Sequence, residues 1–209
     1  MTFKQTVLIT VGLSWIGIAS MYLPPAINFL LLITIGIPFN QFFYLSIYGF
    51  APLTVFFWVI SIVYILNVGK QKKILLIGLT LIYCIIFMSI YYYLLFTDPS
   101  LIGTFVDPFI VNFTLFSRLY FILGLSLFVV SGLIFVKESL KSDNLETILK
   151  AKFLLAALIS FAIGAILTSS FPEILIKVIA RMILVSSSLE LYVGFLLPKK
   201  IKKLFLNVE

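Results

Sequence analysis

The chain has no histidine and only one cysteine, Cys84. Without histidine there can be no His-ligated metal site and no histidine acting as acid or base. A single cysteine cannot form a disulfide within the chain, so cysteine usage does not indicate the redox compartment. Because the sequence also lacks a nucleophile–base pair, a glycine-rich phosphate loop and a metal-ligand cluster, we expect no enzyme activity, no cofactor and no metal.

Charge is also scarce. Only 11% of the 209 residues are charged, 62% are hydrophobic, and the mean hydropathy is +1.22. Soluble domains carry about 25% charged residues, which excludes a soluble globular protein. Continuous apolar runs long enough to cross a hydrocarbon core of about 30 Å favour helices over the alternating strands of a barrel. The expected fold class is therefore all-α, a polytopic integral membrane protein.

The first part of the chain predicts three spans. No charged residue stands between Lys4 and Lys70, and the intervening 65 residues are too many for two membrane helices. Pro24–Pro25 and the segment YGFAPL (residues 48–53) supply the two breaks, because proline is favoured at the start of a helix and disfavoured inside it.

Four further spans follow from helix-start signals. Asp107 before Pro108 predicts an N-cap and a first helical position, and Asp143 with Glu146 matches a capping box. Pro172 opens the last span. We expect one seven-helix transmembrane domain over residues 1–209, with no soluble domain and with spans at about 5–23, 26–47, 51–68, 74–96, 109–136, 147–169 and 172–197.

Basic residues set the expected orientation. The net charge is +7, and eleven of the fifteen basic residues fall in three short stretches after spans three, five and seven. The positive-inside rule places these stretches in the cytoplasm, with the amino terminus outside and the carboxyl terminus inside, and the expected location is the cell membrane. They predict contact with anionic lipid headgroups, and nucleic acid is not an expected partner. The stretches are Lys70, Lys72 and Lys73; Lys137, Lys141, Lys150 and Lys152; and Lys199, Lys200, Lys202 and Lys203.

Charged residues inside the spans are the main functional signal. Glu173, Lys177 and Arg181 share one helical face, and the first two suit an i,i+4 pair near the outer interface. Arg181 lies deeper, where an unpaired charge is costly, and Arg118 is a second cation in the outer half of its span. Two outcomes are open: a closed ion-pair network with the outer carboxylates, or a cationic site for a small anionic ligand.

Other polar residues of the outer half could complete such a site. Asn40 and Gln41 lie near Pro38, which should kink the second span and free a carbonyl. Together with Arg118, Lys177 and Arg181 they form the expected ligand-binding set. The tyrosines at the end of span four suit either an interfacial belt or this site; they are Tyr91, Tyr92 and Tyr93.

Two more features bear on function. Glu190 is the one acid of the inner half and a candidate for proton coupling. A stripe of small residues along span six predicts close packing against another helix, in the bundle or in a homodimer; its members are Ala156, Ser160, Gly164 and Thr168.

The segment IASMYLPPAINF resembles the first motif of PQ-loop and SWEET transporters, in which a proline ends the first helix. Here Ala26 follows Pro25, where that family has glutamine, and no site residue is transferred. The resemblance implies seven spans and small-solute transport. The leading expectation from the residues is a receptor-like or sensor-like bundle that binds a small anionic ligand in its outer half. The alternatives are a small-solute transporter and a non-catalytic subunit of a larger membrane complex.

Overall fold

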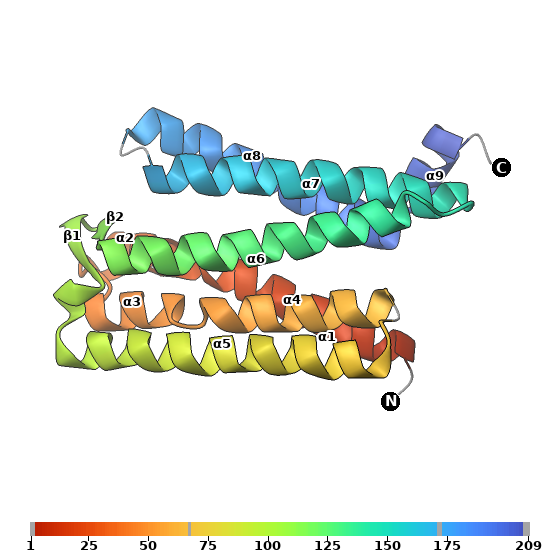
Figure 1. Cartoon of the computed structure of the whole chain (residues 1–209). Coiled ribbons are helices and arrows are strands. Elements are labelled where there is room, and N and C mark those ends of the chain that lie inside the picture. Colours follow the sequence, from red (N-terminus) through yellow and green to blue (C-terminus); the bar gives the residue numbers. More distant parts are fainter. Residues whose placement is uncertain (1–2, 67, 171–172, 207–209) are drawn as a thin grey trace. The chain divides into compact units, whose positions relative to one another are not determined.

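The computed structural model describes residues 3–66, 68–170 and 173–206 and is all-helical, with 83% of these residues in helices. The chain divides into two compact units, Met1–Phe128 and Val129–Glu209. Figure 1 shows the elements in chain order: α1 (Phe3–Ser20), α2 (Leu23–Ile35), α3 (Gln41–Tyr48), α4 (Ala51–Ile65), α5 (Lys70–Thr97), η1 (Pro99–Leu101), β1 (Gly103–Asp107), β2 (Ile110–Phe113), α6 (Leu115–Ser139), α7 (Leu145–Ser170), α8 (Ile174–Leu196) and α9 (Lys199–Leu206).

Several helices are long and apolar enough to cross a membrane. Within the described residues there are 5 candidate spans. One is α3 and α4 taken together as a stretch of 25 residues, and the others are α5, α6, α7 and α8. The bent pair α1 and α2 adds one more if it forms a single broken span, which makes 6. The helices indicate the expected all-α, multi-pass membrane protein, whereas the expected count of seven spans is not confirmed.

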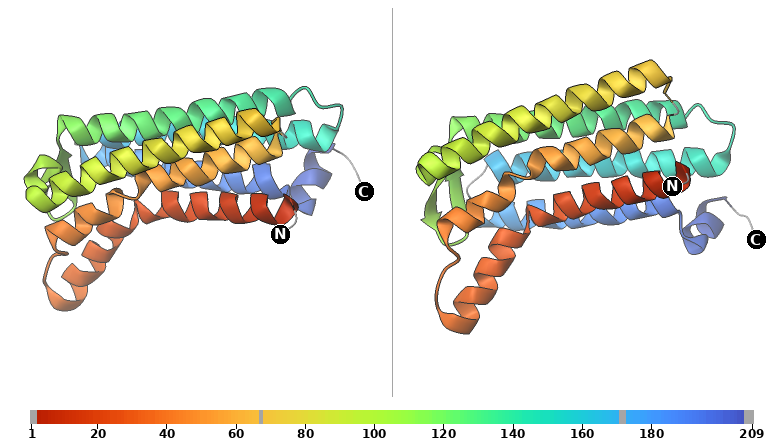
Figure 2. Two further views of the ribbon diagram at one scale, coloured as in Figure 1. Left: turned by 60° about the horizontal axis from the view of Figure 1, so that its bottom comes forward. Right: turned by 90° about the horizontal axis from the view of Figure 1, so that it is seen from below.

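The region expected to form one span over residues 26–47 is instead two helices. Helix α2 ends at Ile35, Gly36 caps it in the left-handed conformation (φ 69°), and α3 begins only at Gln41. Glycine adopts this conformation without the steric cost of a Cβ, so the chain leaves the helix here rather than bending at Pro38. Helices α1 and α2 meet at an angle of 47° just before Pro24, and Figure 2 shows α2 leaving the line of α1.

Two expected helix starts are wrong in detail. Asp107 does not cap a helix: its Oδ1 accepts hydrogen bonds from Phe109 N (2.7 Å) and Ile110 N (2.8 Å) and so closes the turn between β1 and β2. Helix α6 begins later, at Leu115. The N-cap of α7 is Asn144 rather than Asp143, because Asn144 Oδ1 accepts from Glu146 N at 2.8 Å. Pro172, the expected start of the last span, lies outside the described residues.

Helices α1 and α4 pack through small polar residues. Thr10, Ser14 and Thr54 are buried, the Ser14 hydroxyl donates to Thr54 O (3.1 Å), and the Ser61 hydroxyl bonds to Thr10 Oγ1 (2.8 Å). Gly17 continues this face of α1, and a Cβ added there would overlap Thr54 Oγ1 and lie 3.3 Å from Thr54 Cα. Small residues let helix backbones approach closely in a membrane, and hydroxyls hold them together.

Substitution of Gly17 should therefore separate the two helices. We expect Gly17→Ala to lower stability by about 1–3 kcal/mol, because the methyl group overpacks a tight contact. Gly12→Ala is the matched control in the same helix, since nothing lies within 4 Å of a Cβ at Gly12. Thermal unfolding of the purified protein measures both, and equal midpoints for the two variants would contradict this packing.

The α3–α4 break exposes backbone carbonyls that tyrosines satisfy. Gly49 N and Leu53 N bond three residues back, to Ser46 O (3.1 Å) and Phe50 O (3.0 Å), which leaves Leu45 O and Gly49 O without their i+4 donors. The hydroxyl of Tyr91 donates to Leu45 O (2.9 Å), and that of Tyr120 donates to Gly49 O (2.9 Å). These two tyrosines thus replace the helical hydrogen bonds that the break removes.

In the second unit, α7 packs against α8 through glycines. A Cβ at Gly164 would lie 2.7 Å from Leu184 Cγ, and one at Gly194 would lie 2.6 Å from Leu154 Cγ. Ser187, buried, donates to Ala157 O at 2.9 Å. Of the expected small-residue stripe, Gly164 makes this contact inside the unit, whereas Ala156 is exposed.

Candidate functional site

A short antiparallel hairpin between α5 and α6 forms one wall of the candidate site. Strands β1 and β2 pair from Gly103↔Phe113 to Asp107↔Ile110, with an irregularity between Phe105 and Asp107. The hairpin base is fixed to the start of α6, because Thr114 N and the Ser117 hydroxyl both bond to Ile102 O, at 3.0 and 2.7 Å. The hairpin is therefore continuous with the α5 and α6 scaffold rather than a loose loop.

Asn28 joins the hairpin to the segment between α2 and α3. Its side chain is 1% exposed; its Nδ2 donates to Pro108 O, and its Oδ1 accepts from Phe39 N at 2.6 Å. The Asn28 amide thereby pairs both the Pro108 carbonyl and the Phe39 N–H in an apolar setting, where an unpaired polar group is costly. Sequence reasoning missed Asn28, although an amide within the apolar run LPPAINFLLLI is a signal that could have found it.

Aromatic side chains pack the hairpin onto α3. The ring of Phe105 meets Tyr44 edge-on at 4.9 Å, and that of Phe113 meets Tyr48 at 5.5 Å. Each such pair contributes about 0.5–1.5 kcal/mol beyond its buried area. These rings belong to a core cluster whose buried members are Tyr44, Leu45, Tyr91, Leu95, Ile102 and Tyr120.

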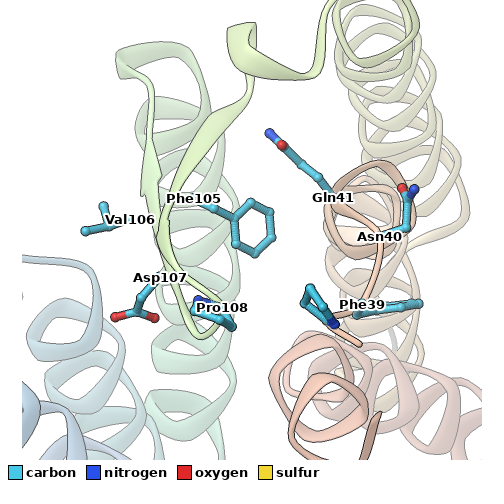
Figure 3. Close-up of a pocket in the computed structure, with 8 residues that line it drawn as sticks. Phe39, Asn40, Gln41, Phe105, Val106, Asp107 and Pro108 are labelled. Atoms are coloured by element: carbon cyan, nitrogen blue, oxygen red, sulfur yellow. The ribbon is translucent and has the colours of Figure 1, made fainter. Parts of the chain in front are cut away.

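A pocket of about 440 Å³ opens between the hairpin and the α2–α3 connection. Figure 3 shows the Phe105 ring and Pro108 on the hairpin side and Phe39 and Gln41 on the other, while Val106 and Asp107 point away from this space. The volume lies within the range of about 300–1,000 Å³ typical of small-molecule sites. Its lining residues are Pro38, Phe39, Asn40, Gln41, Phe105, Val106, Asp107 and Pro108.

The two predicted amides, Asn40 and Gln41, both line this pocket. Asn40 caps α3 through Oδ1, which accepts from Phe42 N at 2.9 Å, so its Nδ2 donor is not used by the cap. Gln41 donates from Nε2 to Gly103 O at 3.2 Å and keeps an acceptor oxygen. The pocket therefore offers one amide donor and one amide acceptor in a mainly apolar lining.

Arg118 does not reach the pocket lining. It is exposed at the start of α6, where Nε donates to Phe113 O (3.0 Å) and Nη2 donates to Asn112 Oδ1 (2.9 Å). These bonds tie the first turn of α6 to strand β2. Arg118 thus has hydrogen-bond partners within its own unit, and no carboxylate in the described part of the chain forms an ion pair with it.

Asp98 ends α5 near the hairpin. The hydroxyl and the backbone N–H of Ser100 donate to its carboxylate at 2.7 and 2.8 Å, and they lower the pKa of Asp98 below its ordinary value. Because the pKa of Asp98 is lower in the folded protein than in the unfolded chain, the turn stabilises the fold at pH values above the unfolded pKa. This stabilisation is lost as the pH falls through the folded pKa. The carboxylate is therefore ionised at neutral pH.

The predicted cations Lys177 and Arg181 lie on α8, in the other unit. Arg181 is exposed beside three apolar residues of its own helix: Val178, Met182 and Val185. The expected Glu173–Lys177 ion pair is not formed, and across the described ranges the salt bridges are Lys141–Glu138 and Lys202–Glu146. Lys177 and Arg181 therefore lie one helical turn apart in the second unit, whereas Arg118 belongs to the first unit.

Glu190 is half-buried on α8. The Ser186 hydroxyl donates to Glu190 Oε1 at 3.0 Å, whereas the buried Oε2 has no hydrogen-bond partner among the residues that the structure describes. Glu190 lies within a candidate membrane span, and carboxylates inside membrane spans usually have a specific role.

Comparison with known protein families, curated proteins and solved structures finds no match for this chain.

Substitution of Asn28 tests whether the pocket wall is held as described. We expect Asn28→Leu to lower stability by about 2–4 kcal/mol, because Phe39 N and Pro108 O each lose their partner. It should also speed proteolytic cleavage between residues 103 and 113. Thr34→Val is the control, since it removes an exposed hydroxyl from the same helix. A variant Asn28→Leu as stable and as resistant as Thr34→Val would contradict this role.

Proposed function

We propose that the protein is a receptor-like or sensor-like membrane protein whose recognition site is the pocket between the β1–β2 hairpin and the α2–α3 connection. One observation carries the proposal: an apolar pocket with an amide donor and an amide acceptor is held open by Asn28 and by aromatic packing. Small-molecule sites have this composition, mostly apolar with a few fixed polar groups.

The lining favours an uncharged ligand over the anion expected from the sequence. No lysine or arginine is among the lining residues, and the Asp107 carboxylate is engaged with backbone N–H groups of its own turn. An anion would have no counter-charge here. The ligand that fits is small and uncharged, with an apolar body and one polar end that both donates and accepts a hydrogen bond.

A six-span topology supports this role. If α1 with α2 and α3 with α4 each form one span, the amino terminus lies on the same side as all three basic stretches. Two spans separate each basic stretch from the next, so all three stretches lie on the same side of the membrane, as the positive-inside rule requires. The hairpin and the α2–α3 connection then lie on the opposite side, so the pocket faces outward while the basic loops are available for a cytoplasmic partner.

Ligand binding can be tested by thermal stabilisation of the purified protein with a panel of small uncharged and anionic molecules. A ligand at a hundred times its Kd raises stability by about 2.7 kcal/mol. For an uncharged ligand that binds in the pocket, Phe105→Ala should weaken binding by roughly tenfold, about 1.4 kcal/mol. Phe96→Ala should not, because Phe96 is an exposed ring, 73% accessible, outside the lining.

Two outcomes would contradict the site. In the first, no uncharged ligand stabilises the protein, or Phe105→Ala and Phe96→Ala reduce its binding equally. In the second, anions stabilise the protein and Arg181→Ala abolishes the gain, which would support the cationic site expected from the sequence instead.

A role as a subunit of a larger membrane complex is a second candidate. Arg181 favours it, because this exposed cation lies in a candidate span and forms no ion pair with the described residues of its unit. A charge in such a span needs a partner or water, and a carboxylate of another chain would supply one. On α7, the small exposed residue Ala156 would let a helix of the other chain approach closely.

A small-solute transporter is the third candidate, and Glu190 favours it. A half-buried carboxylate with one unpaired oxygen in a candidate span is suited to take up and release a proton. The pocket would then be the outer entrance of a transport path.

A further inference from the structure

Helix α9 is placed by a sharp turn directly after the last candidate span. Leu197 ends α8 in the left-handed conformation (φ 42°), its N–H bonds to Val193 O at 2.8 Å, and its side chain is buried, 7% exposed. This conformation is unfavourable for a residue with a Cβ, so the buried leucine must hold it. Pro198 follows and accepts the first bond of α9, from Lys202 N at 3.0 Å. The chain therefore changes direction where α8 ends and starts a new helix.

All residues of α9 except Leu206 separate into two faces. At 100° per residue, Ile201, Leu204 and Phe205 fall on one side and the four lysines on the other. Much of the apolar face is exposed: Leu204 is 71% and Phe205 56% exposed. The four lysines alone are enough to keep α9 on the cytoplasmic side under the positive-inside rule. That rule therefore does not explain why α9 also has an apolar face.

Two contacts attach α9 to the start of α7. Lys202 Nζ forms an ion pair with Glu146 Oε1, and the ring of Phe205 meets that of Phe153 edge-on at 5.6 Å. Glu146 is in the first turn of α7, at the same end of the unit as the end of α8. The helix is thus held beside the ends of two candidate spans, which is the level of the membrane boundary.

We infer that α9 is an interfacial helix that docks on an anionic lipid surface. Leu204 and Phe205 enter the boundary between headgroups and acyl chains, while Lys199, Lys200 and Lys203 contact lipid phosphates, their chains running along the apolar face. Lys202 keeps its bond to Glu146 and orients the helix. The inference does not depend on the proposed ligand pocket, which lies in the other unit.

A fluorescent label at residue 204 tests this docking in the full-length protein. Leu204→Cys in a Cys84→Ser background takes one environment-sensitive nitrobenzoxadiazole group, and the protein is reconstituted in phosphatidylcholine vesicles with or without phosphatidylglycerol. We expect the label to be brighter and better protected from aqueous dithionite when phosphatidylglycerol is present. Because each lysine near an anionic surface is worth about fivefold in binding, the pair Lys200→Gln/Lys203→Gln should weaken docking by about 25-fold.

The control removes the same charge elsewhere. Lys70→Gln/Lys72→Gln changes the start of α5 and should leave the label protected. Equal protection in both vesicle types, no protection in either, or the same loss from both lysine pairs would overturn the inference. Protection in both vesicle types with energy transfer between labels, persisting as the protein is diluted in lipid, would show that a second copy covers α9 instead.

Discussion

The structure of the first unit depends on satisfying the backbone carbonyls at the α3–α4 break. The tight turn around Gly49 leaves the carbonyls of Leu45 and Gly49 without helical donors inside a stretch that is apolar enough to span a membrane. In lipid, water cannot replace those bonds. The hydroxyls of Tyr91 and Tyr120 do so from two other helices, and a Cβ at Gly49 would lie 2.7 Å from Tyr92 Cζ.

The same tyrosines connect the break to the candidate site. Their rings lie 5.0 Å apart, and Tyr91 and Tyr120 share a buried cluster with Tyr44, whose ring supports Phe105 of the hairpin. Helices α5 and α6 carry the tyrosines and also carry the two ends of the hairpin. The position of the pocket wall therefore follows from hydrogen bonds and ring packing within the unit, and Asn28 adds the attachment to the α2–α3 connection.

Apolar runs and proline positions predicted the class of fold and most helices: α1 and α4 to α8 fall within a few residues of their expected ranges, apart from the late start of α6. The break at Gly36 was missed because nothing local reveals that this glycine is left-handed. The hairpin was missed because Asp107–Pro108 suits a helix start as well as a turn. Asn40 and Gln41, singled out from the sequence as amides near Pro38, line the pocket, whereas the contacts of Arg118 and the burial of Tyr91 depend on long-range packing that spacing does not encode.

The most direct test is the stability of single tyrosine hydroxyl deletions. Tyr91→Phe and Tyr120→Phe should each lower the free energy of unfolding by about 1 kcal/mol, because each leaves a buried carbonyl without a donor. Both side chains are almost fully buried, at 0% and 2% exposed, whereas Tyr93 is 71% exposed and serves as the control. Thermal unfolding in the same detergent should place both variants below Tyr93→Phe. If all three unfold at the same midpoint, the break is not held by these hydroxyls and the account of the first unit is wrong.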